Sequence, residues 1–139
     1  MAVNQWQLSF SERFDYGPHG DILFPLVLSS DLSNRVLVRA KLDTGSDVCV
    51  FQKHYAEMLG LQAERGISQR IRTAIGSFSA TGHEVTITVG QLEWQTTVYF
   101  AEDESFPVSV VGRQGFLHRL RAGLVDYEQV LYLAPYEQP

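Results

Sequence analysis

The sequence has a single cysteine, Cys49, among 139 residues. It therefore excludes an internal disulfide and with it the class of disulfide-rich secreted scaffolds. Cys49 lies in an apolar run, where we expect a small buried hydrophobic residue rather than a reactive thiol. The 4 histidines show no ligand-like spacing and no nearby cysteine partner, so we expect neither a metal ion nor a cofactor.

The sequence also lacks an excess of positive charge. Its formal net charge is −5 and its pI is about 5.3. A protein that binds nucleic acid normally presents a basic surface, so we expect no nucleic-acid partner. The arginines form two small clusters that we interpret as solvated faces (Arg65, Arg70 and Arg72; Arg113, Arg119 and Arg121).

Long apolar runs are missing as well. No stretch approaches the roughly 18 apolar residues that a membrane-spanning helix needs. Residues 1–10 do not show the basic segment and apolar stretch of a secretory signal. We therefore expect a cytoplasmic protein that does not contact a membrane.

What the sequence does contain is an alternation of apolar and polar residues with a period of two, which is typical of β-strands. It predicts strands at 22–29, 35–42, 84–89 and 92–100, with a tight turn at Gly90–Gln91. Helical patterns are short and are confined to 53–60 and 113–123. The fold class expected is mostly β with one or two short helices.

The length predicts one domain. We place an N-terminal extension, partly ordered, at 1–20, the folded domain at 21–134 and a tail at 135–139. Near the end, residues 125–133 predict a strand, a turn and a final strand. Because exposed aliphatic side chains on a terminal strand indicate an unpaired edge, we expect another chain to cover it.

Asp43 lies between two apolar runs, although an unpaired charge is costly to bury. The sequence Asp43-Thr44-Gly45-Ser46 predicts a turn there, and a turn by itself would explain these residue types. A second element is found at 106–120, where two aliphatic residues precede Gly112 and Arg113 and a short helical pattern follows. The two elements together favour a functional site over a plain turn.

With both elements in this order, the chain resembles the retropepsin-like aspartic proteases, the single-domain relatives of retroviral protease. "LDTGSD" is similar to the family's catalytic loop and "PVSVVGR" to the segment before its helix. "TAIGSFSATGHEVTITVG" stands where the family has its flap hairpin. The resemblance spans about 21–134 and implies a closed β-barrel or sandwich with a flap hairpin.

The resemblance implies peptide hydrolysis by two aspartates that share one proton and activate a water molecule. This chain has Asp-Thr-Gly only once, and Asp47 is too near Asp43 in sequence to face it across a cleft. The second carboxylate must then be Asp43 of another copy, so the resemblance and the count together predict a homodimer with a two-fold axis. In the family, terminal strands also pair between subunits.

The resemblance assigns roles to the residues around Asp43. The catalytic residues expected are Asp43, Thr44, Gly45 and Ser46. The Thr44 hydroxyl would bond across the dimer axis, Gly45 would let backbone and substrate approach, and the Ser46 hydroxyl would donate to the Asp43 carboxylate.

The substrate-binding residues expected fall into three groups. An ion pair between Asp47 and Arg113 would brace the cleft. Apolar side chains would line the subsites, and a flap tip would close over the substrate and exclude water (Val50, Pro107, Val108 and Val110; Ile75, Gly76 and Ser77).

Two functions remain open at this point. One is an endopeptidase that cleaves extended peptides or unfolded proteins. The other is a catalytically silent module that keeps the fold for dimerisation or for binding extended peptides. The intact Asp-Thr-Gly-Ser sequence favours the first, because a scaffold needs no carboxylate at the dimer axis.

Overall fold

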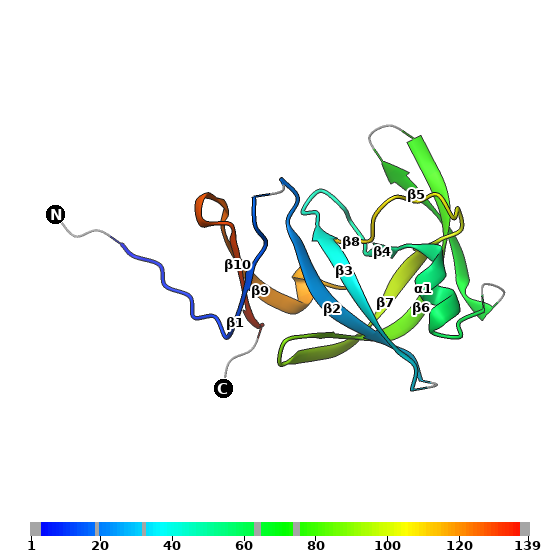
Figure 1. The fold of residues 1–139 in the computed structure, drawn as a ribbon, viewed down its shortest axis with the longest axis horizontal. Helices are drawn as coiled ribbons and strands as arrows, with labels where there is room; N and C mark the ends of the chain where they lie inside the picture. The colour runs from blue at the N-terminus through cyan, green and yellow to red at the C-terminus, as the bar shows by residue number, and fades with distance from the viewer. Residues whose placement is uncertain (1–3, 19, 32, 63–64, 74–75, 137–139) are drawn as a thin grey trace.

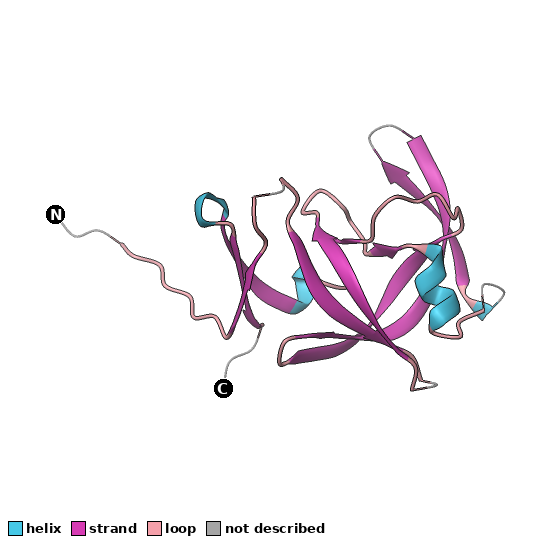
Figure 2. Cartoon of the chain, in the orientation of Figure 1, coloured by secondary structure: helices cyan, strands magenta, loops and turns pink. Residues whose placement is uncertain are grey.

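The computed structural model describes residues 4–18, 20–31, 33–62, 65–73 and 76–136. Within them lie two sheets, one short α-helix and short 3-10 turns (Figures 1 and 2). The strands are β1 (Glu12–Asp15), β2 (Leu23–Ser29), β3 (Arg35–Leu42), β4 (Val50–Phe51), β5 (Ile67–Thr73), β6 (Gly76–Val89), β7 (Leu92–Ala101), β8 (Val110–Val111), β9 (Leu120–Val125) and β10 (Val130–Pro135). The mostly β prediction is confirmed.

The larger sheet has seven strands and curls into a barrel. Its order is β2-β3-β8-β4-β7-β6-β5, and an additional pairing of β2 with β6 closes it. The alternation in β3 is as predicted, because Val36, Val38 and Ala40 are buried and the residues between them are exposed. Buried apolar side chains from the other strands fill the rest of the barrel interior.

The hairpin of β6 and β7 is the longest pairing of the barrel. Thr81 to Val89 and Leu92 to Phe100 run antiparallel, and Gly90 has a φ of 58° in the turn, which glycine adopts without strain. The first half of β6 continues past the barrel and pairs with β5 as a projecting hairpin (Figure 1). The turn predicted at Gly90–Gln91 is confirmed.

The smaller sheet lies at one end of the molecule and has the order β1-β10-β9 (Figure 1). The prediction that the C-terminal strand is an unpaired edge was wrong. β10 lies between β1 and β9 of its own chain, and Val130, Leu131 and Leu133 are buried. β1 comes from residues upstream of the expected domain, and it pairs with the edge of β10 that we predicted to be unpaired.

Only one of the two predicted helices forms as an α-helix. α1 covers Lys53–Met58, and Gly60 follows it with a φ of 73°. The helix predicted at 113–123 was wrong, because only a 3-10 turn forms at Leu117–Arg119 and β9 follows at once. Pairing with β10 along all of β9 outweighs the local helical pattern there.

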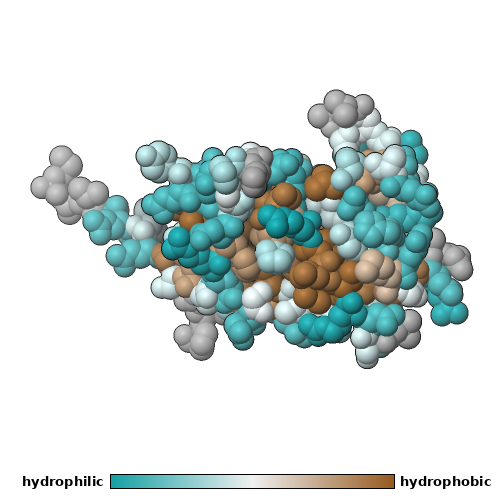
Figure 3. Space-filling view, in the orientation of Figure 1, coloured by the Kyte–Doolittle hydropathy of each residue, from teal (hydrophilic) through white to brown (hydrophobic). Residues whose placement is uncertain are grey.

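The two sheets share one hydrophobic core. Phe24 of the barrel contacts Phe116, and Leu131 and Leu133 of the smaller sheet belong to the same buried cluster. On the face shown in Figure 3, apolar side chains gather over the middle and polar ones surround them. No helix among the described residues has the length and apolar composition needed to cross a membrane.

Candidate active site

Asp43 is the first residue after β3, at the start of a tight turn. Its amide donates to the Val111 carbonyl over 3.0 Å, so the turn begins at a fixed point beside β8. The Gly45 amide donates to Asp43 Oδ1 over 2.9 Å and the Ser46 amide to the Asp43 carbonyl over 3.1 Å. The carboxylate is half-buried and is oriented by its own turn, and among the described residues it forms no ion pair with a lysine or arginine.

The two sequence elements are adjacent in space. Asp43 follows β3, Gly112 follows β8, and these two strands pair in parallel. The Arg113 amide donates to the Ser46 carbonyl over 2.9 Å and the Gln114 amide to the Asp47 carbonyl over 2.8 Å. Backbone hydrogen bonds thus hold the turn that carries Asp43 against the Gly112–Arg113 segment.

Gly112 is required by this contact. A Cβ built at Gly112 would lie 2.3 Å from the Ser46 carbonyl oxygen and 2.6 Å from that of Val48. Since both neighbours are backbone atoms, neither can turn aside as a side chain would. The glycine after the two aliphatic residues therefore has a physical reason in this fold.

The hydrogen bond predicted from Ser46 to the Asp43 carboxylate is not formed. The Ser46 hydroxyl instead donates to the Val48 carbonyl over 2.7 Å. A serine hydroxyl has one proton to donate, and the carbonyl two residues further on lies within its reach in this turn. Ser46 thus braces the turn itself.

The ion pair predicted between Asp47 and Arg113 is also absent. Ion pairs among the described residues join Arg13 to Asp15, Lys41 to Asp21 and Lys53 to Glu104. Asp47 and Arg113 are close along their backbones, as the hydrogen bonds above show, but both side chains are exposed. The prediction of an ion pair between these two side chains was wrong.

A cavity of about 520 Å³ opens beside Asp43. Six of the predicted site residues line it, all from the turn, β4 and β8 (Asp43, Gly45, Ser46, Asp47, Val50 and Val110). Six other predicted site residues are described by the structure but do not line the cavity (Thr44, Gly76, Ser77, Pro107, Val108 and Arg113). Ile75, predicted at the flap tip, falls outside the described residues.

The opposite wall of the cavity comes from the projecting hairpin of β5 and β6, and the part that β5 contributes was not predicted. Five consecutive residues of β5, 69–73, line it together with Phe78 of β6. Two of them are Arg70 and Arg72, which sequence reasoning assigned only to a solvated face. The one signal in the sequence is the apolar pair Ile71 and Phe78, which face each other across the hairpin in a polar segment.

Phe106 closes the cavity at the side. Its ring lies 5.1 Å from that of Phe78, centroid to centroid, so the hairpin and the loop between β7 and β8 touch there. Gln52 holds this loop, because its side-chain amide donates to the Phe106 and Pro107 carbonyls over 3.1 and 3.2 Å. Nothing in the local sequence around Gln52 indicated that role.

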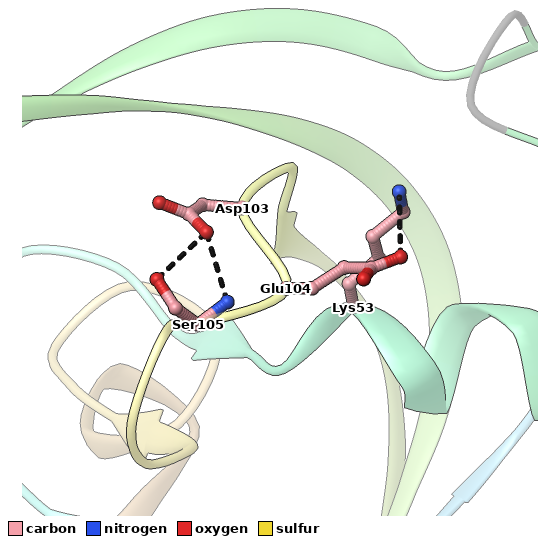
Figure 4. Close-up of polar contacts among 4 residues, drawn as sticks. All are labelled: Lys53, Asp103, Glu104 and Ser105. Atoms are coloured by element: carbon pink, nitrogen blue, oxygen red, sulfur yellow. Dashed lines mark hydrogen bonds and ion pairs between the residues drawn. The ribbon is translucent and has the colours of Figure 1, made fainter.

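The start of the same loop is held by polar contacts (Figure 4). Asp103 accepts hydrogen bonds from the amide and the hydroxyl of Ser105, both over 2.8 Å, and these bonds lower the pKa of the Asp103 carboxyl. Lys53 of α1 lies 3.6 Å from Glu104. Gln52 and Lys53 thus hold the loop between β7 and β8 at Phe106–Pro107 and at Glu104.

Cys49 is fully buried behind the turn, as predicted. Burial raises the pKa of its thiol to about 12, so the thiol stays protonated near neutral pH and does not act as a nucleophile. Among the residues that the structure describes, no group of three His, Cys, Asp or Glu side chains is placed to hold a metal ion. Two carboxylates line the cavity, those of Asp43 and Asp47.

Comparison with known proteins gives a consistent result. The family model described as aspartyl protease matches residues 31–115. EIAV protease, solved with the inhibitor HBY-793, is 23% identical with a TM-score of 0.62, and the match covers 79% of this chain and 97% of the viral one. No curated protein sequence matches the chain.

Two cellular proteins have the same fold. The retropepsin-like aspartic protease from Rickettsia conorii is 18% identical with a TM-score of 0.64, and the match covers 87% of this chain and 96% of that one. The retroviral protease-like domain of Ddi1 from Leishmania major is 19% identical with a TM-score of 0.59, covering 84% and 94%. The chain therefore belongs to the aspartyl protease family and has the retropepsin-like fold.

Proposed function

We propose that the chain is an aspartic endopeptidase that works as a homodimer through Asp43 and its symmetry copy. The observation that carries the proposal is the oriented Asp43 carboxylate on the wall of a cavity that the β5–β6 hairpin borders. Asp47, the other aspartate in the lining, lies in the same turn. A dyad of two facing Asp43 side chains therefore needs a second copy of the chain.

In the proposed reaction the two Asp43 carboxylates share one proton, as the dyads of aspartic proteases do. The ionised carboxylate takes a proton from water while the water oxygen attacks the peptide carbonyl carbon. The protonated carboxyl gives its proton to the carbonyl oxygen. Collapse of the tetrahedral intermediate breaks the C–N bond as the carboxyl that took the proton from water gives it to the amine nitrogen. A hydroxyl of the intermediate returns a proton to the other carboxylate.

The surroundings of Asp43 support this chemistry. Thr44 is exposed in the single chain, next to the carboxylate and available to contact a second copy. The turn, β4 and β8 would form the floor under an extended peptide, and the hairpin would act as the flap above it. An extended peptide or unfolded protein fits a cavity bordered by strands on two sides.

Asp43→Asn tests the catalytic role. The amide is nearly isosteric, so the fold should persist while cleavage of an unfolded protein such as reduced casein falls by at least about 100-fold. Mass spectrometry of the products measures it, and Asp31→Asn, an exposed turn aspartate, is the matched control. Cleavage by Asp43→Asn at the wild-type rate would disprove the proposal.

Mixing tests the shared dyad. With a ninefold excess of Asp43→Asn chains, random pairing leaves about one tenth of the wild-type chains with a wild-type partner. Activity per wild-type chain should fall in that proportion, whereas Asp31→Asn chains in the same excess should contribute their own activity. Undiminished activity in the first mixture would show a monomeric mechanism.

The alternative, a silent module for dimerisation or peptide binding, keeps the fold without the chemistry. A pepstatin-like statine inhibitor separates the two, because its hydroxyl occupies the place of the attacking water between the carboxylates. Binding to the wild type and loss of binding in Asp43→Asn support the endopeptidase. Binding that is equal in both would favour the silent module.

A further inference from the structure

A second cavity lies behind the loop between β7 and β8, away from Asp43. Its volume is about 440 Å³, and it is bordered by α1, the segment after α1 and the strands β6 and β7. No described residue lines both cavities. The loop separates them, because Glu102 at its start faces the second cavity and Phe106 faces the Asp43 cavity.

The floor of the second cavity is apolar. Phe100 and Ala101 of β7 are buried there, and Ala56 and Leu61 pack against the hydrophobic core from the side of α1. A volume in this range with apolar walls is typical of sites for small molecules or single side chains. An aliphatic stem is therefore the kind of group that this floor accommodates.

Two partly polar side chains form the inner wall. Thr81 is buried, and its hydroxyl donates to Glu102 Oε1 over 3.4 Å. The His83 ring lies 6.0 Å from the Phe100 ring, centroid to centroid, in an edge-on arrangement. Gly66 lies against these two side chains, since a Cβ there would lie 2.6 Å from His83 Nε2. Burial lowers the pKa of His83, so the ring brings no positive charge near neutral pH.

The charges at the opening do not balance. Glu57 and Glu102 contribute carboxylates, and among the described residues neither forms an ion pair. Among the described residues of the lining, Lys53 is the one cation, and it lies 3.6 Å from Glu104 (Figure 4). An apolar cavity whose opening carries uncompensated negative charge is complementary to a cation on an apolar stem.

We propose that the second cavity is a binding site for an alkylammonium or guanidinium group, with the stem against Phe100 and Leu61 and the cation between Glu57 and Glu102. Two sources have this chemistry: a free aliphatic amine, and a lysine or arginine side chain of a peptide. Binding does not depend on peptide cleavage. The proposal therefore stands or falls separately from the endopeptidase function.

Hexylamine, hexanol and hexanoate test the charge requirement, because they share one stem and differ in the head group. The probes are titrated into Asp43→Asn protein, so that the Asp43 carboxylate cannot bind the amine, and are followed by NMR of labelled side chains. Hexylammonium should bind at least about tenfold more tightly than hexanol, and hexanoate more weakly than both. Shifts should appear at Thr81, His83 and Leu61. Equal binding of hexanol and hexylammonium, or shifts confined to Val50 and Val110, would overturn the proposal.

The variants complete the test. Glu57→Gln with Glu102→Gln should lower hexylammonium affinity by at least about tenfold and leave hexanol affinity unchanged. The glutamine amide oxygen at 102 can still accept from Thr81, and Glu93→Gln on the exposed face of β7 is the matched control. A double variant that binds hexylammonium as the parent does would refute the proposed recognition.

A competition experiment with a peptide identifies the source of the cation. A blocked Gly-Gly-Lys-Gly-Gly peptide that competes with hexylammonium supports a peptide side chain as the occupant. If the amine binds and the peptide does not compete, the site is one for free amines. Failure of both probes to bind contradicts the proposal even if the wild type cleaves casein.

Discussion

The two sheets of this molecule differ in how their edges are treated. The seven-stranded sheet closes on itself through β2 and β6, and it carries Asp43 in a turn held by backbone hydrogen bonds. The three-stranded sheet is open, with β1 and β9 as its edges. At β9 and the following turn, Leu124 is 47% exposed, Val125 39% and Tyr127 98%. The closed sheet orients the Asp43 carboxylate, whereas the open one presents exposed apolar side chains.

The largest difference in stability should come from a glycine-to-alanine substitution made next to β8 of the closed sheet and within β9 of the open one. Gly112→Ala places a Cβ against two carbonyl oxygens of the turn that carries Asp43, so we expect a loss of about 3 kcal/mol or more in the free energy of unfolding. Gly123→Ala in β9 meets only ring atoms of Phe10, a side chain that can rotate. We expect a change within about 1 kcal/mol there.

Urea denaturation of both variants measures this. Activity gives a second reading, because displacement of the Ser46 and Val48 carbonyls moves Asp43, while Gly123 is remote from it. Equal losses in the free energy of unfolding would mean that the turn at Asp43 accommodates an added Cβ as easily as the Phe10 side chain does.

The open edge should weaken association when it is made charged. If β9 contributes to the dimer, Leu124→Lys with Val125→Lys should raise the dimer dissociation constant at least about tenfold, because like charges would face each other across a two-fold axis. Sedimentation velocity over a dilution series checks it. Leu37→Lys, at an exposed position of the closed sheet, is the control. A dimer untouched by the β9 change would place the interface elsewhere.

The smallest expected effect concerns a hydrogen bond in the open sheet that links the residue after β1 to the residue after β9. The Tyr16 hydroxyl donates to Asp126, and burial followed by that hydrogen bond raises the pKa of Tyr16 to about 12, against 10.0 for a free tyrosine. Between these values the folded chain holds a proton that the unfolded chain has lost. The free energy of unfolding should therefore fall as pH rises from 10 to 12.

Tyr16→Phe should remove that part of the alkaline loss, so that its stability declines less between pH 10 and 12 than that of the wild type. Thermal unfolding at a series of pH values measures the slope. An unchanged slope would show that Tyr16 ionises equally in both states, and the loss would then belong to another buried acid such as the Cys49 thiol.

Local pattern by itself determined several features of this protein. The period of two located β2, β3, β6 and β7, because side chains alternate across any strand whatever its neighbour. Asp43 to Ser46 indicated a turn, and its resemblance to a catalytic loop indicated the family. Gly112 was noted from the sequence, although its reason, the carbonyl oxygens of the facing turn, was not visible there.

Tertiary structure decided the rest. Residues 120–123 belong to the predicted helical pattern, yet they form part of β9 because β10 offers a full antiparallel partner. β10 is covered by β1, the Ser46 hydroxyl turns to Val48, and the Asp43 cavity gains a wall from β5. Each of these depends on which segments far apart in the chain meet. Periodicity acts within one segment, and it carries no information about the partner that a strand, a hydroxyl or a cavity wall finally contacts.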